Sequence, residues 1–323
     1  DELLSIVCGA PNARPGILVC VAKIGAVLPG DFKIKAAKIR DVPSSGMLCS
    51  EKELGLPETQ PGIIELPEEA PLGMDVRQYL GLDDTVIEVD LTANRGDCLS
   101  VMGLARELSA LFGHPIQAPD AGQTPIVWRL QTGLISNDAR TACRIYTLSE
   151  LDGGSSNPAS PSWLQHVLTR CGFTPKNLWV DVTQYVMLLL GQPMHVFDAD
   201  LVHGKIHVRF AREGESCELL DGKQVRLTSQ DLIIADESGP IALAGIMGGK
   251  RTAVSDKTTR VLLESAAFEP IALSGRARHF GLQTEAARRF ERGVDPHLAQ
   301  RAAAYAIYLL ETLGGMKTRS AGY

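Results

Sequence analysis

The sequence predicts an α+β protein of several domains, and three observations point to that fold class. Residues 1–79 alternate short apolar runs with turns rich in Gly, Pro and Asn, a pattern typical of small antiparallel β structure. A helical pattern follows at 97–113, before a stretch rich in Pro, Gly and Gln. Residues 128–323 then mix alternating apolar runs with amphipathic helices, and 323 residues suffice for two or three separately buried cores.

The composition narrows the class of protein. A charged fraction of 22% and a hydrophobic fraction of 45% are typical of a soluble globular chain, and no uninterrupted apolar stretch reaches the ~18 residues of a membrane helix. Asp1 and Glu2 lack the basic start of a signal peptide, and seven scattered cysteines without a CxxC motif indicate reduced thiols. We therefore expect a cytoplasmic protein without a membrane partner. The net charge of −6 argues against a strongly basic nucleic-acid-binding protein but leaves room for a local basic patch.

The first predicted domain, residues 1–79, fits a five-stranded oligonucleotide-binding barrel. Lys33, Lys35 and Lys38 would follow one strand edge, and this pattern fits either an RNA-binding edge or a solvated β surface. The predicted strands lie within Leu3–Val7, Ile17–Ile24 and Phe32–Ile39.

Residues 80–127 are expected to form a small α/β connecting domain. Asp97 is the predicted N-cap of its helix, and Gly113 is expected to end that helix. The neighbouring Asn94 and Arg95 are expected to help hold the helix entry, which is a structural role. The apolar residues expected to face inward are Val101, Ala105, Leu108, Leu111 and Phe112.

The third domain, residues 128–323, begins with strands and helices that frame a candidate site. A helix over Ser162–Cys171 is predicted to turn Trp163 inward, and Asp221-Gly222 predicts a hairpin. The last helix is expected to start at Asp295 as its N-cap.

The candidate site itself is expected where a strand-like run ends at Glu264 and a loop–helix unit follows. That unit concentrates arginines, which predict either electrostatic guidance of an RNA or surface ion pairs with Glu285 and Glu291. The arginines are Arg276, Arg278, Arg288, Arg289 and Arg292.

Several kinds of chemistry are disfavoured by the motifs. His195 lies near Asp198 and Asp200, but no HxxxH or Cys-rich spacing accompanies it, so we expect no metal site. No GxSxG elbow or nucleophilic Cys motif is present, which favours attack by water over a covalent intermediate. The glycines at 245–249 allow close approach of the backbone to a ligand but belong to no Walker or dinucleotide motif.

Long stretches of the chain resemble a known family. IVCGAPN at 6–12, GAVLPGDFKIKAAKIR at 25–40 and SSGMLCSEKELGL at 44–56 resemble the tRNA-binding barrel of bacterial phenylalanyl-tRNA synthetase β subunits. The editing domain of the same subunit is resembled by DVTQYVMLLLGQPMHVFDAD, LLDG, LAGIMGG, VLLESAAFEP and SGRARHFGLQTEAARRFERGVDP. Between them, TANRGDCL resembles the family pattern TPNRxDCL, with Ala93 in place of the proline.

The resemblance implies a fragment of that subunit. It would comprise a truncated tRNA-binding barrel over 1–79, whose first strands precede Asp1, a connecting domain over 80–127 and an editing domain over 128–323. The implied activity is hydrolysis of misacylated Tyr-tRNA(Phe), without aminoacylation by this fragment. The implied partners are tRNA(Phe) and the catalytic α subunit of an α2β2 enzyme. No cofactor is expected in the fragment, and ATP and Mg²⁺ are expected only for the whole enzyme.

The resemblance also implies residue roles. The family pattern DVTNY appears here as DVTQY, so Gln184 replaces an asparagine with one extra methylene. A displacement of about 1 Å in such a group slows a reaction by ~10²-fold. A non-catalytic module that binds RNA or an amino acid, or a structural scaffold of the larger subunit, is therefore the alternative. The implied catalytic residues are His195, Thr284 and Ala286, and the implied substrate-binding residues are Glu264, Gly248, Thr183 and Gln184. The candidate RNA-binding residues, chosen for their charge, are Lys33, Lys35, Lys38, Arg276 and Arg278.

Overall fold

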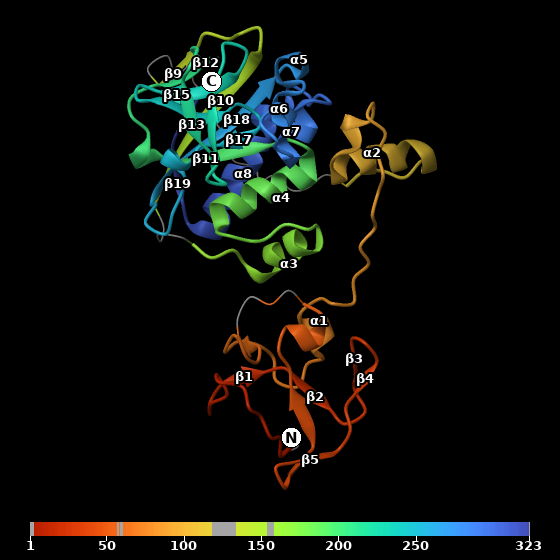
Figure 1. Ribbon diagram of the computed structural model, residues 1–323. Helices are drawn as coiled ribbons and strands as arrows, with labels where there is room; N and C mark the ends of the chain where they lie inside the picture. Colours follow the sequence, from red (N-terminus) through yellow and green to blue (C-terminus); the bar gives the residue numbers. More distant parts are fainter. Residues whose placement is uncertain (1–2, 57, 59–60, 118–133, 154–157, 323) are drawn as a thin grey trace. The chain divides into compact units, whose positions relative to one another are not determined.

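The computed structural model describes residues 3–56, 58, 61–117, 134–153 and 158–322. The chain forms two compact units, residues 1–85 and 86–323 (Figure 1). The expected connecting domain, 80–127, does not form a compact unit of its own among the described residues. Residues 80–85 belong to the first unit, whereas the helix predicted after Asp97 packs within the second. The stretch rich in Pro, Gly and Gln covers residues 115–127 and is expected to be a linker, and part of it lies outside the described residues.

The first unit is built from short antiparallel strand pairs, as the sequence predicts. Hydrogen bonding among the described residues does not close them into a barrel, so the truncated barrel stays a prediction. Leu3–Val7 forms no strand. The unit also contains the 3₁₀ helix Lys52–Leu54 and helix α1 (Val76–Tyr79). The pairs are β1 (Leu18–Val19) with β8 (Glu65–Leu66), β2 (Val21–Lys23) with β7 (Gly46–Leu48), β3 (Val27–Leu28) with β4 (Phe32–Lys33), and β5 (Ala37–Ile39) with β6 (Val42–Ser44).

Asn12, in the GAPN turn, links the segment before β1 to the segment before β8 through hydrogen bonds to Ile63. Its amide Nδ2 donates to the carbonyl of Ile63 at 2.8 Å, and its Oδ1 accepts from the amide of Ile63 at 3.0 Å. Arg14 adds an ion pair with Glu65 at 2.7 Å. The core beneath consists of small and aliphatic side chains, namely Cys20, Ala22, Ile34, Cys49 and Ile64.

The second unit contains two sheets that pack face to face (Figure 1). The four-stranded sheet is antiparallel, in the order β11 (Met194–Asp198), β18 (Arg260–Phe268), β10 (Cys143–Asp152), β19 (Lys317–Gly322). The five-stranded sheet has the order β17 (Met247–Gly248), β16 (Gly239–Leu243), β15 (Leu232–Asp236), β12 (Ile206–Phe210), β9 (Ile135–Asn137), and only β12 and β9 run parallel. The predicted hairpin at Asp221-Gly222 joins β13 (Ser216–Glu218) to β14 (Gln224–Arg226).

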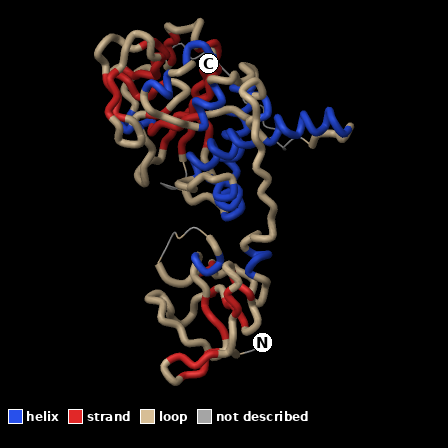
Figure 2. The backbone as a smooth tube through the Cα atoms, turned by 45° about the vertical axis from the view of Figure 1, so that its right-hand side comes forward, coloured by secondary structure: helices blue, strands red, loops and turns tan. Residues whose placement is uncertain are grey.

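Helices cover the outer face of the four-stranded sheet and one edge of the second unit (Figures 1 and 2). Trp179, Val182 and Val186 of α4 meet Leu263 of β18 and Ala302 of α8 in a fully buried core. Helix α4, which ends at Gly191, therefore lies behind the strands that carry the candidate site. The helices of the unit are α2 (Val101–Phe112), α3 (Ser162–Arg170), α4 (Leu178–Leu190), α5 (Pro270–Leu273), α6 (Arg276–His279), α7 (Glu285–Phe290) and α8 (Leu298–Gly314), with 3₁₀ turns at Gly96–Cys98, Ala199–Leu201 and Lys250–Thr252.

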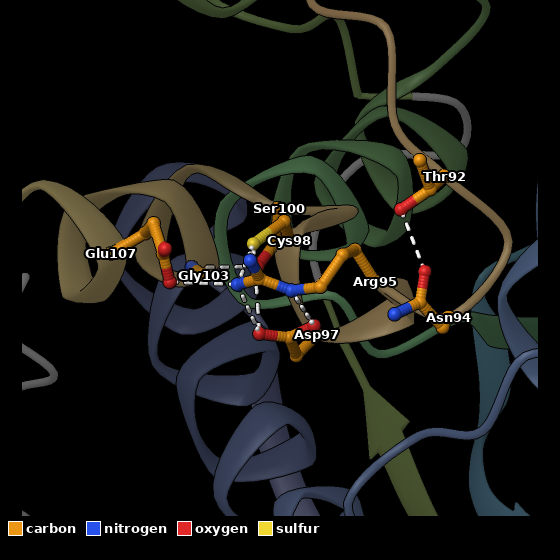
Figure 3. Close-up of polar contacts among 8 residues, drawn as sticks. All are labelled: Thr92, Asn94, Arg95, Asp97, Cys98, Ser100, Gly103 and Glu107. Atoms are coloured by element: carbon orange, nitrogen blue, oxygen red, sulfur yellow. Dashed lines mark hydrogen bonds and ion pairs between the residues drawn. The ribbon is translucent and has the colours of Figure 1, made fainter.

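The NRGDC segment is structural, and Asp97 does not cap the helix as predicted. Asp97 is engaged by the Arg95 guanidinium at 3.1 and 3.0 Å, and the same guanidinium reaches Glu107 of α2 at 2.7 Å (Figure 3). This hydrogen-bonded ion pair lowers the pKa of Asp97 to about 2. Ser100 is the N-cap instead, with its Oγ accepting from the amide of Gly103 at 3.0 Å.

The predicted inward face of α2 is exposed. Among the described residues of this helix, only Gly103 is buried, and Phe112 is 67% exposed. The reason is that the helix docks through its first turn, where Gly103 packs on the backbone of Asp97 and Ser100 contacts Gly191 of the α4 cap. The rest of α2 projects from the unit (Figure 2).

Three smaller expectations are wrong. Trp163 is 43% exposed, and Leu164 and Leu168 are the buried residues of α3. Helix α8 begins at Leu298 with His297 as its N-cap, and Asp295 lies before it and accepts from the amide of His297 at 2.9 Å. Glu264 lies in the middle of β18, not at its end.

Among the described residues, no helix is both long and apolar enough to cross a membrane.

Candidate functional site

A cavity of about 210 Å³ opens between the edge strands of the two sheets. His195 comes from β11, Gly248 from β17 and Glu264 from β18, and Ala286 and Phe290 of α7 close it. Most of its remaining wall is the apolar run 242–247. The structure thus brings together four residues that the sequence singles out from three separate segments: His195, Gly248, Glu264 and Ala286.

The register of β18 explains why a carboxyl group faces this cavity. Alternate side chains of a strand point to opposite faces. Val261 and Leu263 point to the helix-covered core, whereas Ala266 and Phe268 point between the sheets, and Glu264 shares that second face. The partner of Glu264 on β11 is His195, so both polar side chains reach the same space.

The carboxyl group of Glu264 is almost fully buried. It is 6% exposed, and burial raises its pKa to about 7. The buried hydroxyl of Tyr146 donates to its Oε2 at 3.1 Å, which opposes that shift. Burial also raises the pKa of the Tyr146 phenol, so this hydroxyl keeps its proton. Near neutral pH the cavity therefore contains a carboxyl group poised between its two charge states.

His195 is a neutral imidazole in this site. Burial lowers its pKa to about 4, because the surroundings disfavour the cation. Its ring packs edge-on against the ring of Phe197, with 4.5 Å between the ring centroids. Its buried Nε2 has no hydrogen-bond partner among the described residues. An enclosed ring nitrogen without a partner is free to bind a ligand or a water molecule. With so low a pKa, His195 suits orientation of a polar group better than storage of a proton.

Gly248 leaves room for that imidazole. A Cβ atom at position 248 would lie 2.2 Å from the His195 Cε1 and 2.6 Å from its Nε2. Gly245 has a φ of +66°, and a Cβ there would meet Phe290 at 3.0 Å. The glycine run therefore shapes both walls of the cavity.

Thr284 supports the cavity from the N-terminus of α7 rather than lining it. Its Oγ1 accepts from the amide of Ala287 at 3.1 Å as the N-cap, and donates to the carbonyl of Ile246 at 2.9 Å. Ile246 lines the cavity, so one hydroxyl ties the helix to the opposite wall. These contacts are structural, and the catalytic role of Thr284 stays a prediction.

Replacing Thr284 by alanine is expected to lower the free energy of unfolding by about 1–2 kcal/mol, because it removes the cap and leaves the carbonyl of Ile246 unpaired. Thr284→Ser keeps both hydrogen bonds and serves as the matched control. Urea denaturation of the two variants measures the difference. Equal stability of the alanine and serine variants would contradict the supporting role.

Thr183 and Gln184 do not line the cavity. Thr183 is buried in α4, and its Oγ1 donates to the carbonyl of Val180 at 2.7 Å. The Oε1 of Gln184 is buried and has no partner among the described residues. Their predicted role in substrate binding stays a prediction.

The residues predicted to bind RNA fall into two groups. Lys33, Lys35 and Lys38 are exposed in the first unit, and Lys38 lies 3.4 Å from Asp41. Arg276 has a structural role, since its guanidinium forms an ion pair with the buried carboxylate of Asp231 at 3.3 Å. This pairing does not favour an RNA-binding role for Arg276.

Arg278 is placed differently from Arg276. It lines a polar surface groove, and it forms no ion pair among the described residues.

The part of the chain that the structure describes contains no cluster of three acidic, His or Cys side chains able to hold a metal ion. Asp198 accepts from Thr258 at 2.5 Å and Asp200 pairs with Arg260 at 2.6 Å, so both acids near His195 already have partners.

Two residues of the site are missed by the sequence reasoning. Tyr146 is the hydrogen-bond partner of Glu264 but lies 118 positions before it in the chain. Phe290 closes the cavity and packs on Phe268 at 5.1 Å between ring centroids. A signal for Tyr146 is its alternation with Leu148 on an apolar strand, which places its hydroxyl in the core where a partner is required.

Comparison with known families defines the class of protein. The family described as "B3/4 domain" matches residues 142–315, and the family described as "Putative tRNA binding domain" matches residues 1–75. The chain belongs to the B3/4 domain family, and its first unit carries a tRNA-binding type of domain. The resemblance to bacterial phenylalanyl-tRNA synthetase β subunits is thereby confirmed.

The chain is similar to phenylalanine–tRNA ligase beta subunits along nearly its whole length. It is 48% identical over 316 residues to the subunits of Pectobacterium atrosepticum and Yersinia pestis, and 49% identical over 318 residues to that of Haemophilus influenzae. Each match covers 98% of this chain and 40% of the relative, so the chain spans less than half the length of these relatives. Among solved structures, an N-terminal fragment of the phenylalanyl-tRNA synthetase beta subunit from Pyrococcus horikoshii matches with a TM-score of 0.40 and 13% identity, over 71% of this chain and 60% of that one.

Proposed function

We propose that the cavity hydrolyses the ester that joins tyrosine to tRNA(Phe). The observation that carries this proposal is the carboxyl group of Glu264, buried at the wall of an otherwise largely apolar cavity of about 210 Å³. This volume lies below the ~300–1,000 Å³ of a drug-sized ligand pocket and suits a single amino-acid side chain. An apolar wall binds the ring, and the buried carboxyl group selects a ring that carries a hydroxyl.

Selection by hydrogen bonding explains why such a second site is useful. An apolar pocket rejects an added hydroxyl by only ~10²-fold, so a synthetic site for phenylalanine accepts some tyrosine. A site built to bind the hydroxyl discriminates by ~10⁴–10⁵-fold, because phenylalanine would leave its polar group unpaired. Glu264 keeps acceptor capacity beyond its bond from Tyr146, since a carboxylate has about four lone-pair directions.

The reaction requires only a positioned water molecule. Water adds to the ester carbonyl carbon, the bond to the ribose oxygen breaks, and the products are tyrosine and a ribose hydroxyl that takes up a proton. The free Nε2 of His195 is the group that supports orientation of the water or of the terminal ribose. No step here uses ATP or Mg²⁺, which we assign to aminoacylation by the whole enzyme.

The partners follow from the two families and the relatives. We propose that the first unit, with Lys33, Lys35 and Lys38, contacts tRNA(Phe), and that the longer protein assembles with the synthetase α subunit. The basic side chains would add affinity that weakens with salt.

The second candidate function is binding without turnover. It is favoured by the low pKa of His195, about 4, which makes the imidazole a poor general base, and by the position of Gln184 outside the lining of the cavity. A scaffold that becomes active only in the assembled enzyme shares these features.

The decisive experiment follows deacylation of Tyr-tRNA(Phe) and Phe-tRNA(Phe) by this chain, with and without the α subunit and the remainder of the β subunit. Selective loss of the tyrosyl ester is expected. Ala286→Leu is the blocking variant, because it extends a side chain into the cavity at a position where alanine now lies. Tyrosine binding without deacylation under either condition would exclude the hydrolase and leave the binding module.

A further inference from the structure

We infer that a surface groove on the far side of α7 from the cavity binds the phosphates of the RNA strand whose 3′ end enters the cavity. This inference rests on the proposed function. The groove has a volume of about 860 Å³ and is formed by α6, α7 and the turn between them. The residues of this arginine groove used below are Arg278, Arg288, Arg292, Gln283, Glu285 and Glu291.

Helix α7 is the shared wall of the cavity and the arginine groove. Ala286 and Phe290 line the cavity, whereas Arg288 and Arg292 line the groove. Positions two apart on a helix lie about 200° apart around its axis, so Arg288 faces away from Ala286 and Phe290, and Arg292 follows just after the end of α7. A helix with its side chains is about 10–12 Å across. A strand whose terminal ester occupies the cavity would therefore bring its next phosphates over the arginines.

The charges in this region divide into those that hold the fold and those that remain available. Arg289 is 5% exposed, donates to the carbonyl of Leu99 at 3.1 Å and pairs with Glu285, so it belongs to the fold. Arg288 approaches the same Glu285 only at 3.7 Å. Glu291 accepts from the amide of Gly275 at 3.2 Å. Both acids that line the groove are thus already engaged by other donors.

The guanidinium groups left over are those of Arg278 and Arg292. Among the described residues Arg278 forms no ion pair, and Arg292 only donates to the carbonyl of Arg288 at 3.2 Å. Lys223 adds a cation beside Gly281, at the edge of the groove, where its ammonium group donates to the carbonyl of Phe280. Cations gathered at one groove stand out in a chain of net charge −6.

Phosphate is the ligand that fits these groups. A guanidinium offers planar, paired N–H donors that match two phosphate oxygens, and such contacts position a nucleic acid without reading its sequence. Gln283 supplies an uncharged hydrogen-bonding group along the same groove. The ligand class is accordingly the backbone of single-stranded RNA, held in register with the cavity.

The test measures binding of deacylated tRNA(Phe), so it does not depend on hydrolysis. The full chain is titrated against 5′-labelled tRNA in fluorescence anisotropy between 50 and 200 mM salt. Arg278→Ala and Arg292→Ala are each expected to weaken binding about tenfold, as for a charged hydrogen bond. Each is also expected to reduce the slope of log K against log salt by about 0.7, the value per contact on a single strand.

The matched control is Lys317→Ala. Lys317 is an exposed cation on β19, at the opposite edge of the four-stranded sheet from β11, and its removal is expected to change neither affinity nor slope. Arg278→Lys keeps the charge and is expected to restore the salt slope but only part of the affinity. Thermal unfolding confirms that each variant is folded.

Unchanged affinity and slope in both arginine variants would overturn the inference, and competition by an acidic peptide alone would assign the groove to a protein. The two proposals fail separately. If tyrosyl-ester hydrolysis is absent but the arginine variants lose tRNA, the groove stands and the hydrolase does not. If hydrolysis occurs and the variants bind and turn over as wild type, only the groove is rejected.

Discussion

Replacing Glu264 by alanine is expected to lower the ratio of kcat/KM for the tyrosyl ester over the phenylalanyl ester by about 10²-fold, the size of a hydrogen bond to a charged group. Among the described residues that line the cavity, Glu264 is the one acidic residue, and without it the wall is nearly all apolar. Tyrosine would then lose its hydroxyl partner, while phenylalanine would no longer leave a buried carboxyl group with Tyr146 as its one donor within the described part of the chain. Both effects lower the ratio of kcat/KM for the tyrosyl ester over the phenylalanyl ester.

Glu264→Gln is the matched control for this change. It preserves the volume of the side chain and an oxygen that accepts a hydrogen bond, but not the charge, so its ratio is expected to lie between wild type and the alanine variant. Single-turnover deacylation of the two esters gives the ratio directly. A wild-type ratio in the alanine variant would mean that the carboxyl group does not read the substrate hydroxyl.

The residues that meet at the cavity could be predicted because each carries a local signal. His195 follows a Gly-Gln-Pro turn, Gly248 lies in a glycine run, and Glu264 interrupts an apolar strand. Their convergence depends on strand order, since β11 and β17 are edge strands of different sheets. No local pattern encodes that order, and the family resemblance supplied it.

Partners that are remote in the chain account for most of what could not be predicted. Tyr146 meets Glu264 only through the register of β10 against β18. Arg276 reads as an exposed cation until Asp231, 45 positions earlier, is placed beside it. Asp97 carries a good capping side chain, but Arg95 two positions earlier occupies its carboxylate, and Ser100 caps α2. For Tyr146 and Arg276 a contact that is remote in the chain decides the role of the side chain. At Asp97 a neighbouring guanidinium outweighs a capping preference that is worth only about 1 kcal/mol.

The stability of the chain is expected to depend on pH in a way that isolates Glu264. Its pKa is about 7 in the folded state and ordinarily near 4.5, so between these pH values the folded chain binds more protons than the unfolded chain. The stabilisation by the neutral carboxyl group is present below pH 4.5 and is lost as the pH rises through 7. Because one pKa unit corresponds to 1.36 kcal/mol, the loss amounts to about 3 kcal/mol.

His195 opposes this trend and partly hides it in the wild type. Its pKa is about 4 in the folded state against an ordinary 6.5, so its contribution to stability is present above pH 6.5 and is lost as the pH falls through 4. The two dependences run in opposite directions over the same window. Wild-type stability between pH 4.5 and 6.5 is therefore expected to change less than either group alone would cause.

Glu264→Gln separates the two groups, because glutamine does not titrate. The difference in free energy of unfolding between wild type and this variant, measured by urea denaturation, is expected to move against the wild type by about 3 kcal/mol from pH 4.5 to 8. Tyr146→Phe removes the hydrogen bond that lowers the pKa of Glu264, so the same loss should extend to higher pH. A difference curve that is flat across this range would show that Glu264 is ionised and solvated in the folded chain, and the hydroxyl-reading role of a desolvated carboxyl group would fail with it.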